Sequence, residues 1–138
     1  MSRQDILQGS FARLVGYELA DWREDEVEVR LQVGEQHMNR SGVLHGGAMT
    51  TLIDAACGYA GCYSPDPQRP RRAMTLSLTC NFVAAVQAGA LLTARARRTG
   101  GGRQIFFSEC KVEDEKGRLV AEASGVFKYR RGSEPEGG

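Results

Sequence analysis

Residues 45–63 have the sequence HGGAMTTLIDAACGYAGCY, and this stretch decides the fold. It is long and apolar enough for one helix, and Asp54 is its only acidic residue, which is typical of a helix buried along much of its length. Four segments with strand-like alternation follow it, at residues 73–82, 90–98, 103–113 and 119–129. One helix followed by an antiparallel meander predicts an α+β fold, in which a curved antiparallel sheet of five to six strands wraps around one central helix.

The chain before this helix adds at least one strand and a short helix. Residues 26–33 alternate strictly between apolar and polar side chains, which predicts a half-buried strand. Residues 4–15 place apolar side chains at helical intervals, which predicts an amphipathic helix that packs as a lid. The later strands carry apolar residues on both faces, such as Phe106 and Phe107. We therefore expect a homo-oligomer in which a second copy covers part of the sheet.

Length and composition indicate an ordinary globular domain. The 138 residues fit a single domain at residues 1–131, followed by a disordered tail at residues 132–138 that lacks apolar side chains. Eighteen Lys and Arg against 17 Asp and Glu give a net charge of +1, so the composition predicts no general affinity for nucleic acid or membrane. No apolar run of about 18 residues and no secretory pattern occur, which predicts a soluble, cytoplasmic protein.

The cysteines and histidines do not have the spacing of a metal site. No CxxC or HExxH pattern occurs, and His37 and His45 are eight residues apart, so no metal is expected. No P-loop or dinucleotide-binding pattern occurs either. The four cysteines lie in apolar or strand-like segments and are predicted to be buried free thiols: Cys57, Cys62, Cys80 and Cys110.

The predicted central helix has one face of small residues. That face carries Gly47, Thr50, Thr51, Asp54, Gly58 and Gly61. Glycine inside a helix costs about 0.5–1 kcal/mol relative to alanine, so the two later glycines indicate close approach of another backbone. We expect this face to be a contact surface between subunits and Asp54 to lie in a tight, functional contact. A solvated or structurally hydrogen-bonded carboxylate is the alternative.

Gly46 and Gly47 begin the helix, where free N–H groups and the helix dipole suit an anion or an oxyanion. A plain turn is the alternative. Gly46 and Asp54 are eight residues apart, or about 12 Å along one helix, which is too far for both to act on one carbon atom. If both act, the Gly46 N–H of one subunit must face Asp54 of another, which predicts a two-fold dimer with two active sites at its interface.

The segment NRSGVLHGG at residues 39–47, followed by Leu52-Ile53-Asp54, resembles the signature of hotdog-fold acyl-CoA thioesterases of the PaaI type. This resemblance implies hydrolysis of an acyl-CoA to a carboxylic acid and free CoA, with CoA as part of the substrate and no cofactor. It also implies dimers that share a continuous sheet and that pair into homotetramers. Aromatic acyl groups, such as hydroxylated phenylacetyl or benzoyl, are favoured, with medium-chain groups next.

The same resemblance implies roles for individual residues. Asp54 would act as general base or nucleophile, and the Gly46 N–H of the partner subunit would polarise the carbonyl, with Gly47 beside the substrate. Asn39 would orient the reacting groups, and His45 would hold the loop or the carbonyl region unless it is only a helix cap. Thr75 would place a hydroxyl beside the acid, although Ser77 is an alternative.

Two arginine clusters are candidates for the CoA phosphates. Arg97, Arg98 and Arg103 flank the predicted turn at residues 100–102, and Arg69, Arg71 and Arg72 lie in the connector after the helix. Each is also compatible with a solvated surface charge. The acyl pocket is expected to be lined by the helix, by the strand near Met74 and Leu76, and by a loop of the partner.

Two other functions stay open. An enoyl-thioester hydratase or dehydratase would use a histidine with an acid, and absorbance of the enoyl group would distinguish it from a thioesterase. A non-catalytic acyl-CoA-binding protein would be stabilised by its ligand without turnover, although no DNA-binding motif accompanies the domain.

Overall fold

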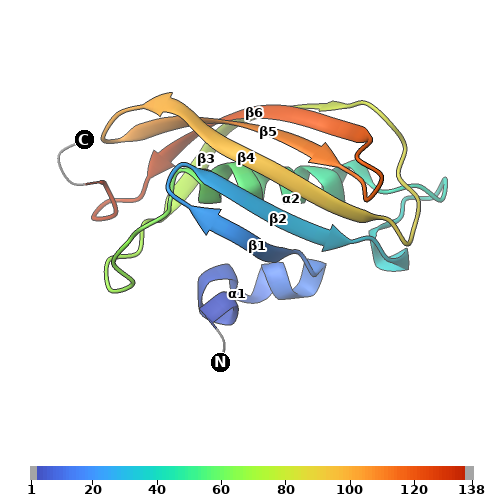
Figure 1. Ribbon diagram of the computed structural model, residues 1–138, viewed down its shortest axis with the longest axis horizontal. Helices are drawn as coiled ribbons and strands as arrows, with labels where there is room; N and C mark the ends of the chain where they lie inside the picture. The colour runs from blue at the N-terminus through green and yellow to red at the C-terminus, as the bar shows by residue number, and fades with distance from the viewer. Residues whose placement is uncertain (1–2, 136–138) are drawn as a thin grey trace.

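The structure is a computed structural model that describes residues 3–135. Two α-helices, one short 3₁₀-helix and six strands follow one another along the chain (Figure 1): α1 Arg3–Val15, β1 Glu18–Arg23, β2 Glu26–Gln32, η1 Glu35–His37, α2 Gly46–Ala60, β3 Ala73–Phe82, β4 Leu91–Gly101, β5 Ile105–Glu113 and β6 Leu119–Tyr129. Within the described residues, no helix is long and apolar enough to cross a membrane.

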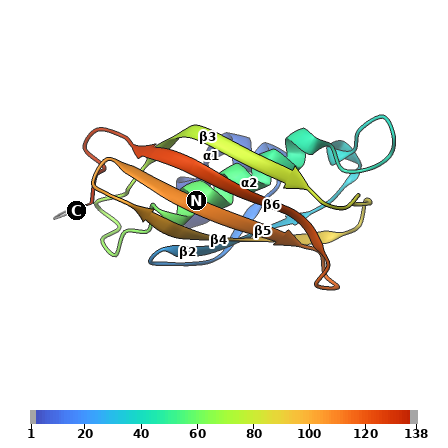
Figure 2. The same cartoon turned by 90° about the horizontal axis from the view of Figure 1, so that it is seen from above.

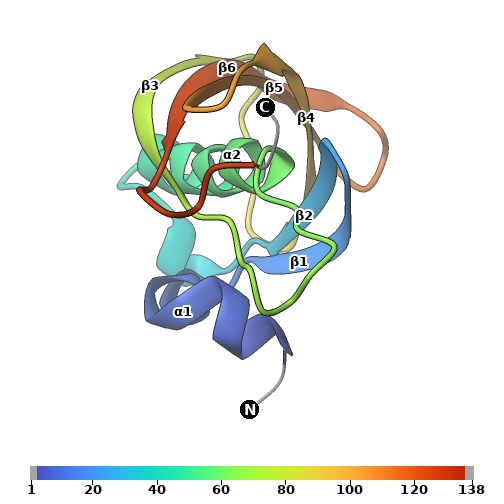
Figure 3. The ribbon, with the colours of Figure 1, turned by 90° about the vertical axis from the view of Figure 1, so that its left-hand side faces the viewer.

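All six strands form one antiparallel sheet in the order β1-β2-β4-β5-β6-β3. Seen end-on, the sheet curls around α2, with β3 at one edge of the curl and β1 at the other (Figure 3). The view from above shows α2 running beneath β6 and β5 (Figure 2). The predicted α+β hotdog architecture, with a sheet wrapped around one helix, is therefore confirmed.

The core lies between α2 and the inner face of the sheet. The alternation predicted for residues 26–33 is present, because Val27, Val29, Leu31 and Val33 are buried while their neighbours point outward. On α2, the residues Leu52, Ile53 and Ala56 are fully buried against these strands. Burial of these apolar side chains is the main term that holds the helix inside the curl.

The two glycines at the end of α2 contact aromatic rings of their own chain, and for Gly61, which is buried, this corrects its assignment to a subunit contact surface. Gly61 lies directly against the ring of Phe106, and Gly58 faces Phe127. Phe106 is fully buried and stacks on Phe127 with 5.2 Å between ring centroids. The small size of Gly61 is therefore explained by an aromatic layer within the chain, whereas Gly58 is only in ordinary contact with that layer.

Strand β3 forms an open edge of the sheet, because it pairs only with β6. A register shift between Thr75 and Ser77 marks a bulge near its start. Four apolar side chains on or next to this edge are exposed: Met74, Leu76, Phe82 and Val83. An unpaired edge with exposed apolar side chains is a natural site for strand pairing with another chain.

Helix α1 packs beside β1 and η1, below the curl in Figure 1. Ala12 is buried and the Val15 carbonyl lies 2.6 Å from His37 Nε2, but Phe11 and Leu14 point outward with 59% and 78% of their surface exposed. Within residues 9–15 the predicted amphipathic packing is therefore only partly present, and the side chains predicted at residues 4–8 lie outside the described part of the chain. A non-helical conformation at Gly9 (φ 76°) kinks α1, which breaks the regular helical spacing.

The cysteines and the C-terminal tail differ in part from their predictions. The prediction that all four cysteines are buried is wrong for Cys80, which is half-buried because it lies on the edge strand β3. Of the predicted disordered tail, residues 132–135 are described: Gly132 ends a turn that begins at Arg131, and its N–H donates to a Glu134 carboxylate oxygen at 2.9 Å. Residues 136–138 lie outside the described part of the chain.

Candidate active site

Three neighbouring contacts join α2 to the edge strand β3. Along one line of the helix, at intervals of four residues, Asp54 meets Thr75, Thr50 meets Cys80, and Gly46 meets Phe82. Successive contacts are about 6 Å apart on the helix axis. At one end of this line, a carboxylate meets a hydroxyl; at the other end, a backbone amide lies beside an aromatic ring. The contacts therefore become less polar from Asp54 toward Gly46.

Asp54 is half-buried and holds a short hydrogen bond. Thr75 Oγ1 donates to Asp54 Oδ1 at 2.6 Å. The bulge after Thr75 shifts the side-chain alternation of β3, so Thr75 faces the helix although it is three residues from Leu78, which packs against the core. The structure thus joins Thr75, and not Ser77, to the candidate acid.

The Asp54 carboxylate contributes to the raised pKa values of two neighbouring groups, the Tyr17 hydroxyl and the Cys80 thiol. Burial raises the pKa of the Tyr17 hydroxyl, and the Asp54 carboxylate raises it further. Burial raises the pKa of the Cys80 thiol. The hydrogen bond with the Thr50 hydroxyl lowers this pKa, and the charges of Cys57 and Asp54 raise it. Thr50 was predicted to share a helix face with Asp54, but sequence reasoning missed Tyr17 and Cys80 as neighbours of the acid, because nothing in their local pattern points to α2.

The start of α2 presents one free amide. His45 is the N-cap: its Nδ1 accepts the Gly47 N–H at 2.7 Å, and its carbonyl accepts the N–H groups of Ala48 and Met49. Among the described residues, the Gly46 N–H has no hydrogen-bond partner. His45 therefore holds the loop and the helix start, and Gly46 offers the N–H that an oxyanion would need.

Asn39 organises the loop that leads to α2. Its Oδ1 accepts the N–H groups of Ser41 at 2.9 Å and Val43 at 3.2 Å. Its own N–H donates to the Val43 carbonyl, and the His45 N–H donates to the His37 carbonyl at 2.8 Å. In this structure Asn39 positions the loop before Gly46 and is not bonded to Asp54.

His37 is a structural residue. It is buried, its Nδ1 accepts the Gly34 N–H at 2.9 Å, and its Nε2 therefore carries the proton that is donated to the Val15 carbonyl. Both ring nitrogens are used in joining η1 to α1. Across residues 3–135, no three His, Cys, Asp or Glu side chains gather in a way that would hold a metal ion.

The predicted phosphate-binding arginines separate into two regions. Arg97 points away from α2 and forms an ion pair with Glu109 at 2.6 Å. Arg98 reaches the Gly102 carbonyl at 3.4 Å, and its buried Nε is without a partner in the described part of the chain, while Arg103 is exposed in the turn after β4. The second cluster lines a cavity of about 730 Å³ between the connector and the C-terminal turn: Arg69, Arg71 and Arg72.

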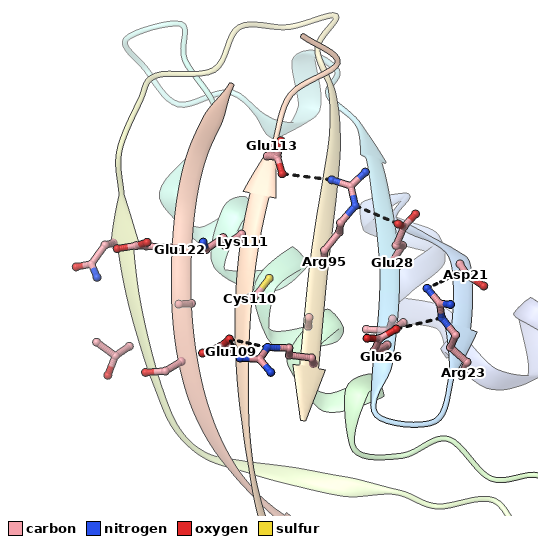
Figure 4. Close-up of a pocket in the computed structure, with 17 residues that line it drawn as sticks. Asp21, Arg23, Glu26, Glu28, Arg95, Glu109, Cys110, Lys111, Glu113 and Glu122 are labelled. Carbon is pink, nitrogen blue, oxygen red and sulfur yellow. Dashed lines mark hydrogen bonds and ion pairs between the residues drawn. The ribbon is translucent and has the colours of Figure 1, made fainter. Parts of the chain in front are cut away.

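A cavity of about 850 Å³ lies on the outer face of the sheet (Figure 4). Arg95 bridges Glu28 at 3.0 Å and Glu113 at 3.4 Å, and Arg23 pairs with Glu26 at 3.2 Å. Most of its charges are therefore neutralised within the cavity, on the face of the sheet opposite Asp54. A smaller apolar cavity of about 300 Å³ lies next to Gly46, at the end of β3.

Comparison with known proteins identifies the family of the chain. Residues 41–121, more than half of the chain, match the family model of the thioesterase superfamily. The Pseudomonas aeruginosa protein PA0474, named as a candidate esterase, is 34% identical over 102 residues, which are 74% of each chain. The 1,4-dihydroxy-2-naphthoyl-CoA hydrolase of Listeria monocytogenes is 29% identical over 106 residues, 77% of this chain and 84% of that one.

Solved structures share the fold. The conserved protein PA5202 from Pseudomonas aeruginosa has a TM-score of 0.84 and 29% identity, covering 94% of this chain and all of its own. The Escherichia coli PaaI protein of the phenylacetic acid degradation operon has a TM-score of 0.79 and 22% identity over 91% of this chain and 87% of its own. A hypothetical thioesterase from Streptococcus pneumoniae, solved with coenzyme A, has a TM-score of 0.72 and 24% identity over 82% and 87%.

The fold and the matched residues define the class of protein as a thioester hydrolase with the hotdog fold. The chain belongs to the thioesterase superfamily. The family resemblance carried by residues 39–54 is thereby confirmed.

Proposed function

We propose that the protein hydrolyses acyl-CoA thioesters to a carboxylic acid and free CoA, with Asp54 and the Gly46 N–H of a partner subunit acting on the same carbonyl. The observation that carries the proposal is the hydrogen bond between Thr75 and Asp54, which holds one carboxylate oxygen at the edge strand. The other oxygen is left to take a proton from water or to attack the thioester carbon. A thiolate is a good leaving group, so no separate acid is required to expel it.

The position of β3 supports a site shared between two subunits. Thr75 lies near the start of β3 and holds Asp54, whereas Phe82 lies at its end and contacts Gly46. In an antiparallel pairing of two β3 edges about a two-fold axis, the start of one strand lies beside the end of the other. Such pairing brings Asp54 of one subunit toward the Gly46 N–H of its partner, although they are about 12 Å apart within one helix.

The substrate assignment rests on the relatives. The Listeria relative is named for an aromatic acyl-CoA, and the Streptococcus neighbour was solved with coenzyme A. The connector arginines suit the CoA phosphates best, because Arg72 directly precedes β3 and is three residues before Thr75, or about 10 Å away along an extended chain. Arg97 suits them least, since it is paired with Glu109 on the outer face. Pairing of dimers into a cytoplasmic homotetramer stays a prediction.

The first test measures free-thiol release from aromatic, short, medium and long acyl-CoAs. Asp54→Asn is expected to lose at least 100-fold in kcat, because the amide neither accepts the proton nor attacks. Thr75→Val should lose about 10-fold and Thr75→Ser should recover the loss, since the hydroxyl positions the carboxylate. Glu122→Gln removes an exposed carboxylate from the outer face and serves as the matched control.

A mixing experiment tests the shared site. Gly46→Pro removes the N–H, and proline fits the first position of a helix after the extended residue His45 (ψ 135°). Asp54→Asn and Gly46→Pro proteins are each expected to be inactive. Co-refolded in equal amounts, they should recover about a quarter of the parent activity, because half of the dimers are mixed and each mixed dimer holds one intact site.

The outcomes separate the alternatives. No recovery in the mixed sample would place both groups in one subunit and contradict the shared site. Thermal stabilisation by acyl-CoA without thiol release would replace hydrolysis by binding alone. Loss of enoyl absorbance without thiol release would indicate a hydratase.

A further inference from the structure

The apolar cavity at the start of α2 is built from two segments that are fixed to each other. It is lined by Leu44, Gly46 and Met49 on the helix side and by Phe82 and residues 83–86 on the strand side. The Leu44 N–H donates to the Val86 carbonyl at 2.8 Å, and the Val83 N–H donates to the Val120 carbonyl at 2.9 Å. The backbone around the cavity is therefore held in place, and side chains determine its size.

Phe82 forms the outer wall of this cavity. A Cβ placed on Gly46 would lie 3.5 Å from the Phe82 ring, so the ring sits in ordinary contact over the first residue of α2. Leu44 and Met49 are buried, whereas Phe82 keeps 55% of its surface exposed. The ring thus stands between the cavity and solvent, beside the free N–H of Gly46.

The chemistry of the lining identifies the part of the substrate that fits. Every side chain that lines the cavity is apolar, and its polar surface comes from backbone groups, of which the Ala85 carbonyl accepts a hydrogen bond from Arg118 at 3.0 Å. A thioester carbonyl bonded to the Gly46 N–H has its acyl chain on one side and its pantetheine arm on the other. The amides and phosphates of CoA would lose hydrogen bonds with water in such a cavity, whereas an acyl chain would gain from burial.

We propose that this cavity receives the acyl group and that Phe82 limits the size of the acyl group that is accepted. The proposal rests on the proposed thioesterase function and on Gly46 as carbonyl donor. About 300 Å³ is at the lower end of the range of small-molecule pockets, which suits one aromatic ring or a short chain. Met74 and Leu76, which we expected in the pocket from the sequence, lie at the opposite end of β3 from Phe82.

The test compares acyl-chain selectivity in three variants. Thiol release is measured for butanoyl-, octanoyl-, dodecanoyl- and phenylacetyl-CoA with the parent, Phe82→Ala and Phe82→Trp. Phe107→Ala is the matched control, because Phe107 is a similarly exposed phenylalanine on the outer side of β5. Each additional buried methylene group is expected to change kcat/KM about four-fold. The ratio of dodecanoyl to butanoyl kcat/KM should therefore rise at least 10-fold in Phe82→Ala and fall in Phe82→Trp.

The possible results are distinct. A selectivity profile of Phe82→Ala that superimposes on the parent profile, with both proteins active, would overturn the role of Phe82 and leave the thioesterase function intact. If the parent releases no thiol from any acyl-CoA, the proposed function fails and this inference fails with it. If Phe82→Ala does not fold, Phe82→Leu provides the larger cavity, and the same ratio decides.

Discussion

Alanine at Gly61 and alanine at Gly58 are expected to change the free energy of unfolding in opposite directions. A Cβ on Gly61 would lie 2.5 Å from Phe106 Cζ and still closer to Cε2 and Cδ2. The ring cannot move aside, because it is fully buried between Phe127 at 5.2 Å and Tyr129 at 4.8 Å. Such overpacking costs about 1–3 kcal/mol. Displacement of the Gly61 carbonyl also weakens its buried hydrogen bond from the Tyr129 hydroxyl, at a cost of about 1 kcal/mol.

Gly58 is the matched control three residues earlier on the same helix. A Cβ there would lie 3.6 Å from Phe127 Cε2, which is ordinary van der Waals contact. Alanine is favoured over glycine inside a helix by about 0.5–1 kcal/mol. We therefore expect Gly58→Ala to stabilise the protein by that amount, and Gly61→Ala to destabilise it by about 2–4 kcal/mol.

Urea denaturation followed by far-ultraviolet circular dichroism measures both changes. The protein concentration must be the same in each sample, because self-association shifts the apparent stability. The expected order of midpoints is Gly58→Ala, then the parent, then Gly61→Ala. Equal midpoints for Gly61→Ala and the parent would refute the packing argument. Loss of stability and of self-association in Gly58→Ala would show that this helix face contacts a second subunit after all.

Three further predictions concern the frame around the site. Trp22→Phe removes the hydrogen bond from Nε1 to the Tyr59 carbonyl, 2.8 Å long, and should lower the free energy of unfolding by about 1 kcal/mol in urea denaturation. Burial raises the pKa of the Cys62 thiol from 9.0 to about 12, so its proton is held more tightly in the folded state. This difference contributes a free energy of unfolding of the order of 4 kcal/mol, which should be present below pH 9 and lost as the pH rises through 12. Cys62 should react with a thiol reagent at pH 8 only after unfolding. Asn39→Ala removes the acceptor of two partly exposed backbone N–H groups and should cost about 0.5–1.5 kcal/mol, whereas Asn39→Asp, which keeps the acceptor, should retain most of the stability; equal losses in both variants would contradict this.

The sequence predicts the central helix and five of the six strands, most of them because their burial follows simple periods, although β3, which is largely exposed at the edge of the sheet, does not. Residues 26–33 alternate apolar and polar side chains, and β2 buries the apolar set as predicted. The sequence does not predict the bounds of β1, Glu18–Arg23, and the reason is physical. A register shift between Leu19 and Asp21 places Leu19 and Trp22, three residues apart, in the half-buried positions. The bulge therefore removes the period of two on which strand prediction depends.

Apart from Thr75, which the family resemblance supplied, the site was predictable only where one local motif contains it. Asp54, His45 and Gly46 lie within one short segment, and the structure places them on the start and middle of α2. The contact of Phe82 with Gly46 joins positions that are 36 residues apart, and no local pattern reports it. For the same reason Gly61 was interpreted wrongly: the sequence shows that a small residue is present, but not that Phe106 lies against it.

The strand order also determines when the candidate site can form during protein synthesis. In the described sheet, strand β3 pairs only with β6, and β4 and β5 lie between these two strands in the sequence. Strand β3 is therefore translated well before the strand with which it pairs. Until β6 exists, Thr75 has no neighbouring strand to hold it opposite Asp54, although both residues have been translated long before. A nascent chain that stops before Leu119 would therefore contain every residue of the candidate site, but the site would not be assembled. The late pairing of β3 makes assembly of the site one of the slow, long-range steps of folding.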